Sequence, residues 1–270
     1  MVDNGQQWIV KITDDVAVMN FDNPPVNYLG ADGLFQFEIA LNEVRRANPA
    51  AIVITGAPDQ FFITHFYVED ILAGQGKIKD RGPVGNHRAQ LLLERLAELP
   101  QPIIAAMNGD AMGFGFELAL ACDIRIAQQG DFRIGLPEVR MGILPGAGGT
   151  QRLLRLVGTG RALELIMRAR VVTPDQALAY GMVHQVVDDA KAAALALAHE
   201  FAGLPPTAVA MAKSVIYGGA EVDLRTGQRI ERDGSYRSKL TPEATEAMQE
   251  YVALPLESRR AWLDGLAIEP

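Results

Sequence analysis

The stretch from Asn108 to Leu118 reads NGDAMGFGFEL, and the stretch from Leu136 to Arg152 reads LPEVRMGILPGAGGTQR. In the first stretch, Gly113 and Gly115 stand just before an apolar segment, Phe116 to Cys122, which we predict to be a helix. The first N–H groups of a helix have no partner inside it and lie at the positive end of its dipole. The pattern therefore predicts a helix start that can stabilise an oxyanion.

Each half of this glycine-rich centre carries one glutamate. Glu117 lies within the first turn of the predicted helix, and Glu138 follows Pro137, a residue suited to the first position of a helix. Two carboxyl groups that hold one water can divide the acid and base roles if an apolar pocket raises one pKa. Acids are also common in first turns because the helix dipole favours them, so the pattern alone leaves a purely structural role open.

Glycine clusters also suggest nucleotide sites, but two details disfavour that interpretation. Leu118 stands where a dinucleotide-binding fingerprint has its third glycine, and residues 142–150 lack the Lys–Ser/Thr pair of a phosphate-binding loop.

Composition narrows the function classes further. The 270 residues carry 25 Lys and Arg against 33 Asp and Glu, a net charge of −8, which disfavours a nucleic-acid partner. The single cysteine, Cys122, excludes an internal disulfide and a multi-cysteine metal site, and we expect it to be a small core residue. No apolar run approaches the roughly 20 residues of a membrane span, and the first residues do not resemble a signal peptide. We therefore expect a cytoplasmic protein without a membrane partner.

The chain as a whole reads as an α/β core over residues 1–188, followed by a helical region over residues 189–270. Short apolar runs around Thr13–Asp15 predict a hairpin near the start. Glycine-rich residues 74–86 predict an exposed loop, and Asn108–Asp110 predicts a turn. Thr173, Pro174 and Gln176 form a capping-box pattern that predicts a helix start.

These motifs together resemble the crotonase superfamily, the enoyl-CoA hydratases and isomerases. The centre is similar to the family pattern N-G-x-A-x-G-G-G-x-E-L, and the resemblance covers most of the chain. Further matches are Asn23–Pro24–Pro25–Val26–Asn27, Cys122–Asp123, Pro137–Glu138, the stretch from Gly142 to Leu153 and the stretch from Thr173 to Val183.

The resemblance implies a spiral of ββα units with a helical C-terminal region that forms trimers or pairs of trimers. It implies that Glu138 delivers or removes the α-proton, that Glu117 activates water, and that Thr64 and Phe114 supply the oxyanion-hole N–H groups. The implied substrate is an enoyl-CoA thioester; no metal or redox cofactor is implied, and CoA arrives as part of the substrate. The residues expected around the substrate are Phe62, His65, Phe66, Tyr67, Gly113 and Gly146.

Several positions depart from the family pattern. The usual F-x-A-G-x-D-L motif is replaced by Phe62 to Val68, so that Thr64, His65 and Tyr67 stand for alanine, glycine and aspartate. Phe114 replaces the middle glycine of the centre. Retention of both glutamates favours a hydratase. The departures leave open an isomerase, a CoA-independent hydrolase of β-dicarbonyl C–C bonds, or a non-catalytic protein that binds acyl-CoA.

Overall fold

The structure is a computed structural model that describes residues 5–57, 60–85 and 87–265. It divides into two compact units, Met1–Ala202 and Gly203–Pro270. The sequence placed this boundary at residue 188, but it lies after Ala202. Helix α8 (Ala190–Ala202) packs on strands β3, β5 and β7 and therefore belongs to the first unit.

The first unit is built on a large sheet. Its strands, in spatial order, are β1 (Trp8–Thr13), β2 (Val16–Phe21), β3 (Ala51–Gly56), β5 (Ile103–Met107), β7 (Ile124–Gln128) and β10 (Gln185–Val187). β1 and β2 pair antiparallel and form the predicted hairpin, whereas the other neighbours pair in parallel. Parallel neighbours need crossover connections, so helices must cover the faces of this sheet.

A smaller sheet contains β4 (Gln60–Phe61), β6 (Gly109–Met112), β8 (Ile134–Gly135) and β9 (Val171–Val172). Successive strand pairs, β3 and β4, β5 and β6, β7 and β8, each place one strand in the large sheet and the next in the small one. This repeat, closed each time by a helix, is the ββα spiral that the family resemblance implied.

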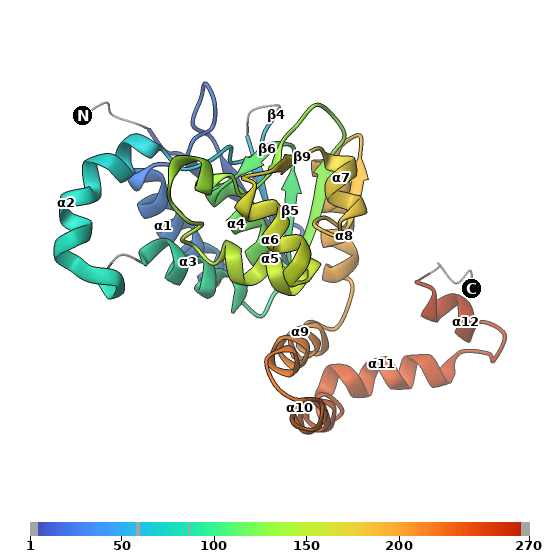
Figure 1. The fold of residues 1–270 in the computed structure, drawn as a ribbon. Helices are drawn as coiled ribbons and strands as arrows, with labels where there is room; N and C mark the ends of the chain where they lie inside the picture. Colours follow the sequence, from blue (N-terminus) through green and yellow to red (C-terminus); the bar gives the residue numbers. More distant parts are fainter. Residues whose placement is uncertain (1–4, 58–59, 86, 266–270) are drawn as a thin grey trace. The chain divides into compact units, whose positions relative to one another are not determined.

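The remaining elements of the first unit are α1 (Ala31–Ala47), α2 (Val68–Gly85), α3 (Arg88–Ala97), α4 (Phe114–Ala121), the 3₁₀ turn η1 (Glu138–Met141), α5 (Gly149–Val157), α6 (Thr159–Met167) and α7 (Pro174–Ala179). Strand residues alternate between two cores. Met19, Ile54 and Ala105 face the cluster that includes α1, α3 and α4, whereas Val53 and Ile104 face Ala194 of α8. The large sheet is therefore covered on both faces (Figure 1).

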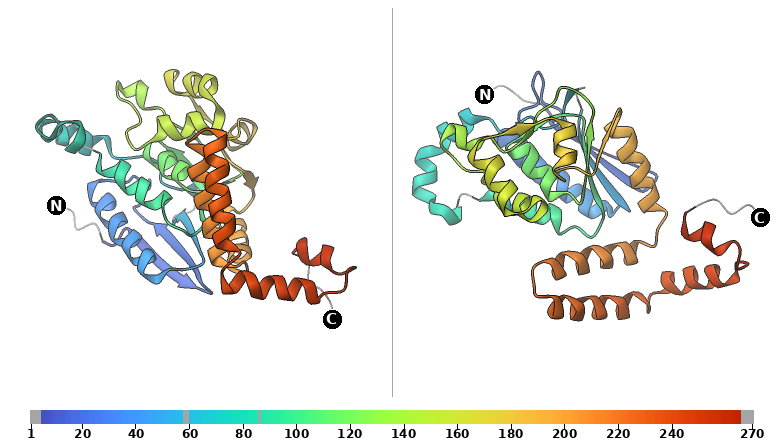
Figure 2. Two further views of the ribbon diagram at one scale, coloured as in Figure 1. Left: turned by 90° about the horizontal axis from the view of Figure 1, so that it is seen from below. Right: turned by 45° about the vertical axis from the view of Figure 1, so that its right-hand side comes forward.

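Two local predictions were wrong. Residues 74–85 lie in helix α2, which extends away from the sheet (Figure 2), since each interior glycine costs a helix only about 1 kcal/mol. The structure departs from helical geometry at Gly82, and the last residue of the predicted loop, residue 86, lies outside the described ranges. The expected turn at Asn108–Asp110 opens strand β6 instead, because Gly109 pairs closely with Gln60 of β4.

Two other local predictions are confirmed. Thr173 and Gln176 form a capping box at the start of α7, and Cys122 is buried.

The second unit consists of α9 (Pro206–Ala220), α10 (Leu224–Ser238), α11 (Pro242–Ala253) and α12 (Arg259–Leu263). α9 and α10 lie side by side (Figure 2). Across the part of the chain that the structure describes, no helix has the length and apolar character needed to cross a membrane.

Candidate active site

Two backbone segments, residues 62–66 and 112–115, lie side by side and form the floor of the site. The N–H of Met112 donates to the carbonyl oxygen of Thr64 at 2.8 Å. A Cβ added at Gly115 would lie 1.7 Å from the carbonyl oxygen of Ile63, so only glycine permits this approach. Helix α4 consequently begins at Phe114, two residues earlier than predicted, and all its residues are buried.

Glu117 is held by the glycine-rich turn before α5. Its Oε1 accepts hydrogen bonds from the N–H groups of Ala147 at 2.7 Å and Gly149 at 2.8 Å. Burial raises the pKa of Glu117, and these two N–H groups and the charge of Arg152 oppose that rise. Glu117 is only 3% exposed. Both hydrogen bonds go to Oε1, so they fix one carboxylate oxygen and leave the other for a ligand.

The residues that hold Glu117 were not among those expected at the site. Arg152 donates from Nη1 to the carbonyl oxygen of Ala147 at 2.9 Å and so ties the turn to α5. The signal in the sequence was the Gly146–Gly149 run, since glycine allows a backbone to approach another group closely.

Substituting Gly149 by alanine is expected to displace the Glu117 carboxylate. The new Cβ would lie 2.9 Å from Cγ and Oε1 of Glu117 and from Cδ1 of Leu136. We expect a roughly 10- to 100-fold loss of kcat and about 1–3 kcal/mol of lost stability from overpacking. Steady-state kinetics and chemical denaturation measure the two effects.

Gly160 provides the matched control, since it is exposed on α6 and an added Cβ meets nothing within 4 Å. Gly160→Ala is expected to keep full activity and to stay within about 1 kcal/mol of wild-type stability. Equal kinetics for the two variants would contradict the proposed role of the turn.

Glu138 opens the 3₁₀ turn η1 and is only 7% exposed. Within the described residues, its Oε2 is buried and has no hydrogen-bond partner. Burial raises its pKa to about 7, with a further contribution from the negative charge of Glu117; its own backbone N–H opposes the rise. A carboxyl group with a pKa near neutrality can both give and take a proton at physiological pH.

Gly113 brings Glu138 next to the segment at His65. With φ of 52°, Gly113 occupies the region that favours glycine, and an added Cβ would lie 3.2 Å from Oε1 of Glu138 and 3.8 Å from Cβ of His65. The predicted residues Gly113, His65 and Glu138 therefore meet at one place, at the start of α4.

Thr64 cannot serve as the oxyanion-hole donor that the resemblance implied. Its N–H already donates to the carbonyl oxygen of Asn27 at 3.1 Å, its Oγ1 donates to the carbonyl oxygen of Val26 at 2.6 Å, and its own carbonyl binds Met112. Every polar group of Thr64 is thus used to join segments of the fold, which corrects that expectation.

The N–H groups of Phe66 and Phe114 are the better donors. Phe66 forms a parallel bridge with Leu29, in which the bonds run from Leu29 N–H to His65 and from Tyr67 N–H to Leu29. Since successive residues of an extended chain point their N–H groups to opposite sides, the N–H of Phe66 faces away from Leu29. Within the described ranges, neither Phe66 N–H nor Phe114 N–H has an acceptor. Their rings pack edge to face, with centroids 6.2 Å apart.

The other expected substrate contacts divide into two groups. Phe62 is fully buried in the core, so its side chain does not line the site. Tyr67 is half-buried and packs edge-on against Tyr28, and Gly146 is exposed one residue before the N–H that holds Glu117. Gly146 thus adjoins the turn that holds Glu117, whereas Tyr67 lies against Tyr28.

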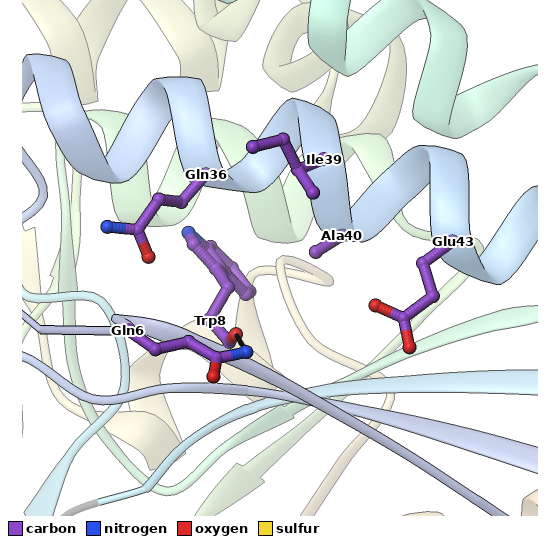
Figure 3. Close-up of a pocket in the computed structure, with 6 residues that line it drawn as sticks. All are labelled: Gln6, Trp8, Gln36, Ile39, Ala40 and Glu43. Atoms are coloured by element: carbon purple, nitrogen blue, oxygen red, sulfur yellow. Dashed lines mark hydrogen bonds between the residues drawn. The ribbon is translucent and has the colours of Figure 1, made fainter.

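Cavities elsewhere on the first unit do not carry this chemistry. One of about 300 Å³ lies between β1 and α1 (Figure 3) and is lined by Gln6, Trp8, Gln36, Ile39, Ala40 and Glu43. Another of about 250 Å³ is lined by Gln60, Asn108, Gln128, Asp188, Asp189 and Lys191. Neither includes a residue that the sequence placed at the active site.

Comparison with known proteins shows the family of the chain. Residues 11–261 match the family described as enoyl-CoA hydratase/isomerase. The short-chain-enoyl-CoA hydratase of Clostridium acetobutylicum is 35% identical over 88% of this chain and 91% of its own length. The crotonyl-CoA hydratase of Syntrophomonas wolfei is 32% identical over 94% and 96%. The crystal structure of an enoyl-CoA hydratase from Bacillus anthracis superposes with a TM-score of 0.85 at 33% identity, covering 92% of this chain and 96% of that one. The chain belongs to the enoyl-CoA hydratase/isomerase family.

Proposed function

We propose that the protein is an enoyl-CoA hydratase that adds water across the 2,3 double bond of an enoyl-CoA thioester. The observation that carries this proposal is the pair of buried glutamates, of which Glu138 has a buried, unpartnered oxygen and a pKa near 7. The names of the relatives from Clostridium and Syntrophomonas support the same reaction and the same substrate class.

The two glutamates divide the reaction between them. Glu117, fixed by Ala147 and Gly149, accepts a proton from water as the water oxygen bonds to the β-carbon. The electron pair of the double bond moves toward the thioester carbonyl, and the α-carbon takes a proton from Glu138. The N–H groups of Phe66 and Phe114 stabilise the negative charge that develops on the carbonyl oxygen. CoA takes part as a portion of the substrate, and the reaction requires no change in oxidation state from a cofactor.

The test is loss of the conjugated enoyl-thioester absorbance with a panel of short, medium and aromatic enoyl-CoAs. Turnover with formation of the 3-hydroxyacyl-CoA, identified by mass, is the expected result. Conversion of a 3-enoyl-CoA to its 2-enoyl isomer without hydration would favour the isomerase instead. Tight binding of every member without turnover would overturn the proposal in favour of a binding protein.

Self-association through the second unit is part of the proposal. None of the residues in α9, α10 or α11 is buried, whereas large apolar side chains are open to solvent, including Leu224 at 78% and Val252 at 62%. So few helices cannot be stabilised without a buried apolar surface, which copies of the same chain can supply. We infer a homotrimer or a pair of trimers, acting in the cytoplasm, where the single cysteine stays reduced.

Breaking this association is expected to change the mass in solution. We expect the wild type at three or six times the chain mass of 29.3 kDa by light scattering, and the double variant Leu224→Glu/Val252→Glu at lower mass. Arg225→Glu, a charge change on the same exposed helix, is the matched control and is expected to leave the assembly intact. A monomeric wild type would contradict the inference.

A further inference from the structure

His65, which stands where the family pattern has glycine, is bonded to the backbone of its neighbour. Its Nδ1 lies 2.7 Å from the carbonyl oxygen of Phe66. A carbonyl oxygen only accepts hydrogen bonds, so Nδ1 carries the proton and donates. This bond therefore sets the tautomer of a neutral His65, with Nε2 as the unprotonated nitrogen.

An aromatic neighbour fixes the plane of the same imidazole. The rings of His65 and Tyr28 have centroids 3.8 Å apart and an interplanar angle of 34°. Tyr28 in turn packs edge-on against Tyr67, at 5.3 Å and 70°. The imidazole is thus held by a stacking contact on its face and a hydrogen bond at its edge.

The carbonyl that His65 binds belongs to the residue that offers its N–H to the site. In an extended residue, N–H and C=O point to the same side, which for Phe66 is the side away from Leu29. The partial negative charge of that carbonyl would oppose an oxyanion nearby. A donor on the carbonyl counters this effect, while the bonds to Leu29 already hold the two peptide groups.

We infer that His65 is a positioning residue: its Nδ1–H holds the Phe66 carbonyl and offsets the negative charge of that oxygen, which would otherwise weaken the binding of the thioester oxyanion by the Phe66 N–H. The inference rests on the proposed function, because it needs a thioester bound at this place. It explains why a bulky side chain replaces the glycine of the family pattern without loss of the site. His65 touches the peptide group and takes no part in proton transfer.

Two substitutions of His65, with one control elsewhere, separate the hydrogen bond from the stacking contact. His65→Phe keeps a ring against Tyr28 and removes the donor, whereas His65→Asn keeps a donor in the place of Nδ1 and removes the ring. His199→Phe, on the exposed face of α8, is the matched control. We expect kcat to fall about 10- to 50-fold in His65→Phe with little change in KM, since loss of one oxyanion donor altogether costs about 10²–10³. His65→Asn is expected to recover most of that loss.

A spectroscopic readout tests the effect on the bound thioester directly. A cinnamoyl-CoA with an electron-donating amino group on its ring absorbs at longer wavelength when hydrogen bonds polarise the thioester carbonyl. The wild type and His65→Asn are expected to shift the bound ligand strongly to the red, and His65→Phe to shift it much less at equal occupancy. An equal shift in His65→Phe and the wild type would overturn the inference.

Failure of the proposed function has a different signature. A wild type that neither shifts the cinnamoyl-CoA spectrum nor hydrates any enoyl-CoA would reject the hydratase proposal itself. Wild-type turnover with a full red shift, unchanged by His65→Phe, rejects only the role of His65. Circular dichroism of each variant identifies any that fail to fold, and His65→Asn then carries the comparison with His199→Phe.

Discussion

Glu138→Gln is expected to lower kcat by about 10²–10⁴-fold, the usual contribution of a positioned general acid or base. Glutamine has the same size as glutamate and can form hydrogen bonds, but it cannot exchange a proton with the α-carbon. Substrate binding should persist, because the proposed N–H donors, Phe66 and Phe114, are untouched. Stopped-flow turnover of a crotonyl thioester, with binding measured separately, gives both quantities. Retention of more than a tenth of wild-type kcat would reject the proposed role of Glu138.

The pH dependence of the wild type follows from the same carboxyl group. The reactive pair holds one proton, so activity falls when Glu138 loses its proton, near its pKa of about 7. Hydration consumes no net proton, and its equilibrium constant is therefore independent of pH. The values of kcat/KM for hydration and dehydration must then decline together above pH 7. A profile flat to pH 9 would contradict the assignment.

Stability should change in the opposite direction to activity in Glu138→Gln. Folding raises the pKa of Glu138 from its ordinary 4.5 to about 7, so the native state favours the protonated form. The contribution of protonated Glu138 to the free energy of unfolding is fully present below pH 4.5 and is lost as the pH rises through 7. At pH 9 the neutral glutamine should be more stable than wild type by on the order of 3 kcal/mol, at about 1.4 kcal/mol per pKa unit. Denaturation at pH 4.5 and 9 tests this, and no gain at pH 9 would contradict it.

The glutamate pair could be predicted from the sequence because its signal is local. Glu117 and Glu138 each adjoin a glycine-rich turn, and glycine marks the points where a backbone must approach another group. Burial of both side chains then follows from the apolar residues around them. The ββα spiral was also predictable, since the motifs that resemble the family extend over most of the chain.

The choice between Thr64 and Phe66 was not predictable in this way. It depends on which N–H groups donate to the carbonyl oxygens of Asn27 and Leu29, residues more than 30 positions earlier in the chain. The same reason applies at Gly109, where a local pattern typical of a turn is overridden by strand pairing with Gln60. Local patterns indicate where the backbone is unusual, whereas long-range pairing decides which groups remain free.

Glu117→Gln is expected to lower kcat by a similar factor, about 10²–10⁴, because the amide cannot take a proton from water. Its oxygen can still accept the hydrogen bonds of Ala147 and Gly149, so the fold should remain near wild-type stability. Glu117→Ala is the informative comparison, since it leaves two buried N–H groups without an acceptor, at about 1–3 kcal/mol each.

The two variants should therefore be equally inactive but differ in stability by several kcal/mol, because the cavity left by alanine adds to the loss of the hydrogen bonds. Single-turnover kinetics and urea denaturation of the pair measure this separation. If Glu117→Ala were as stable as Glu117→Gln, the Ala147 and Gly149 bonds would not be what holds the carboxylate. If Glu117→Gln kept wild-type kcat, water activation would have to come from Glu138 alone, and the division of labour between the two glutamates would be wrong.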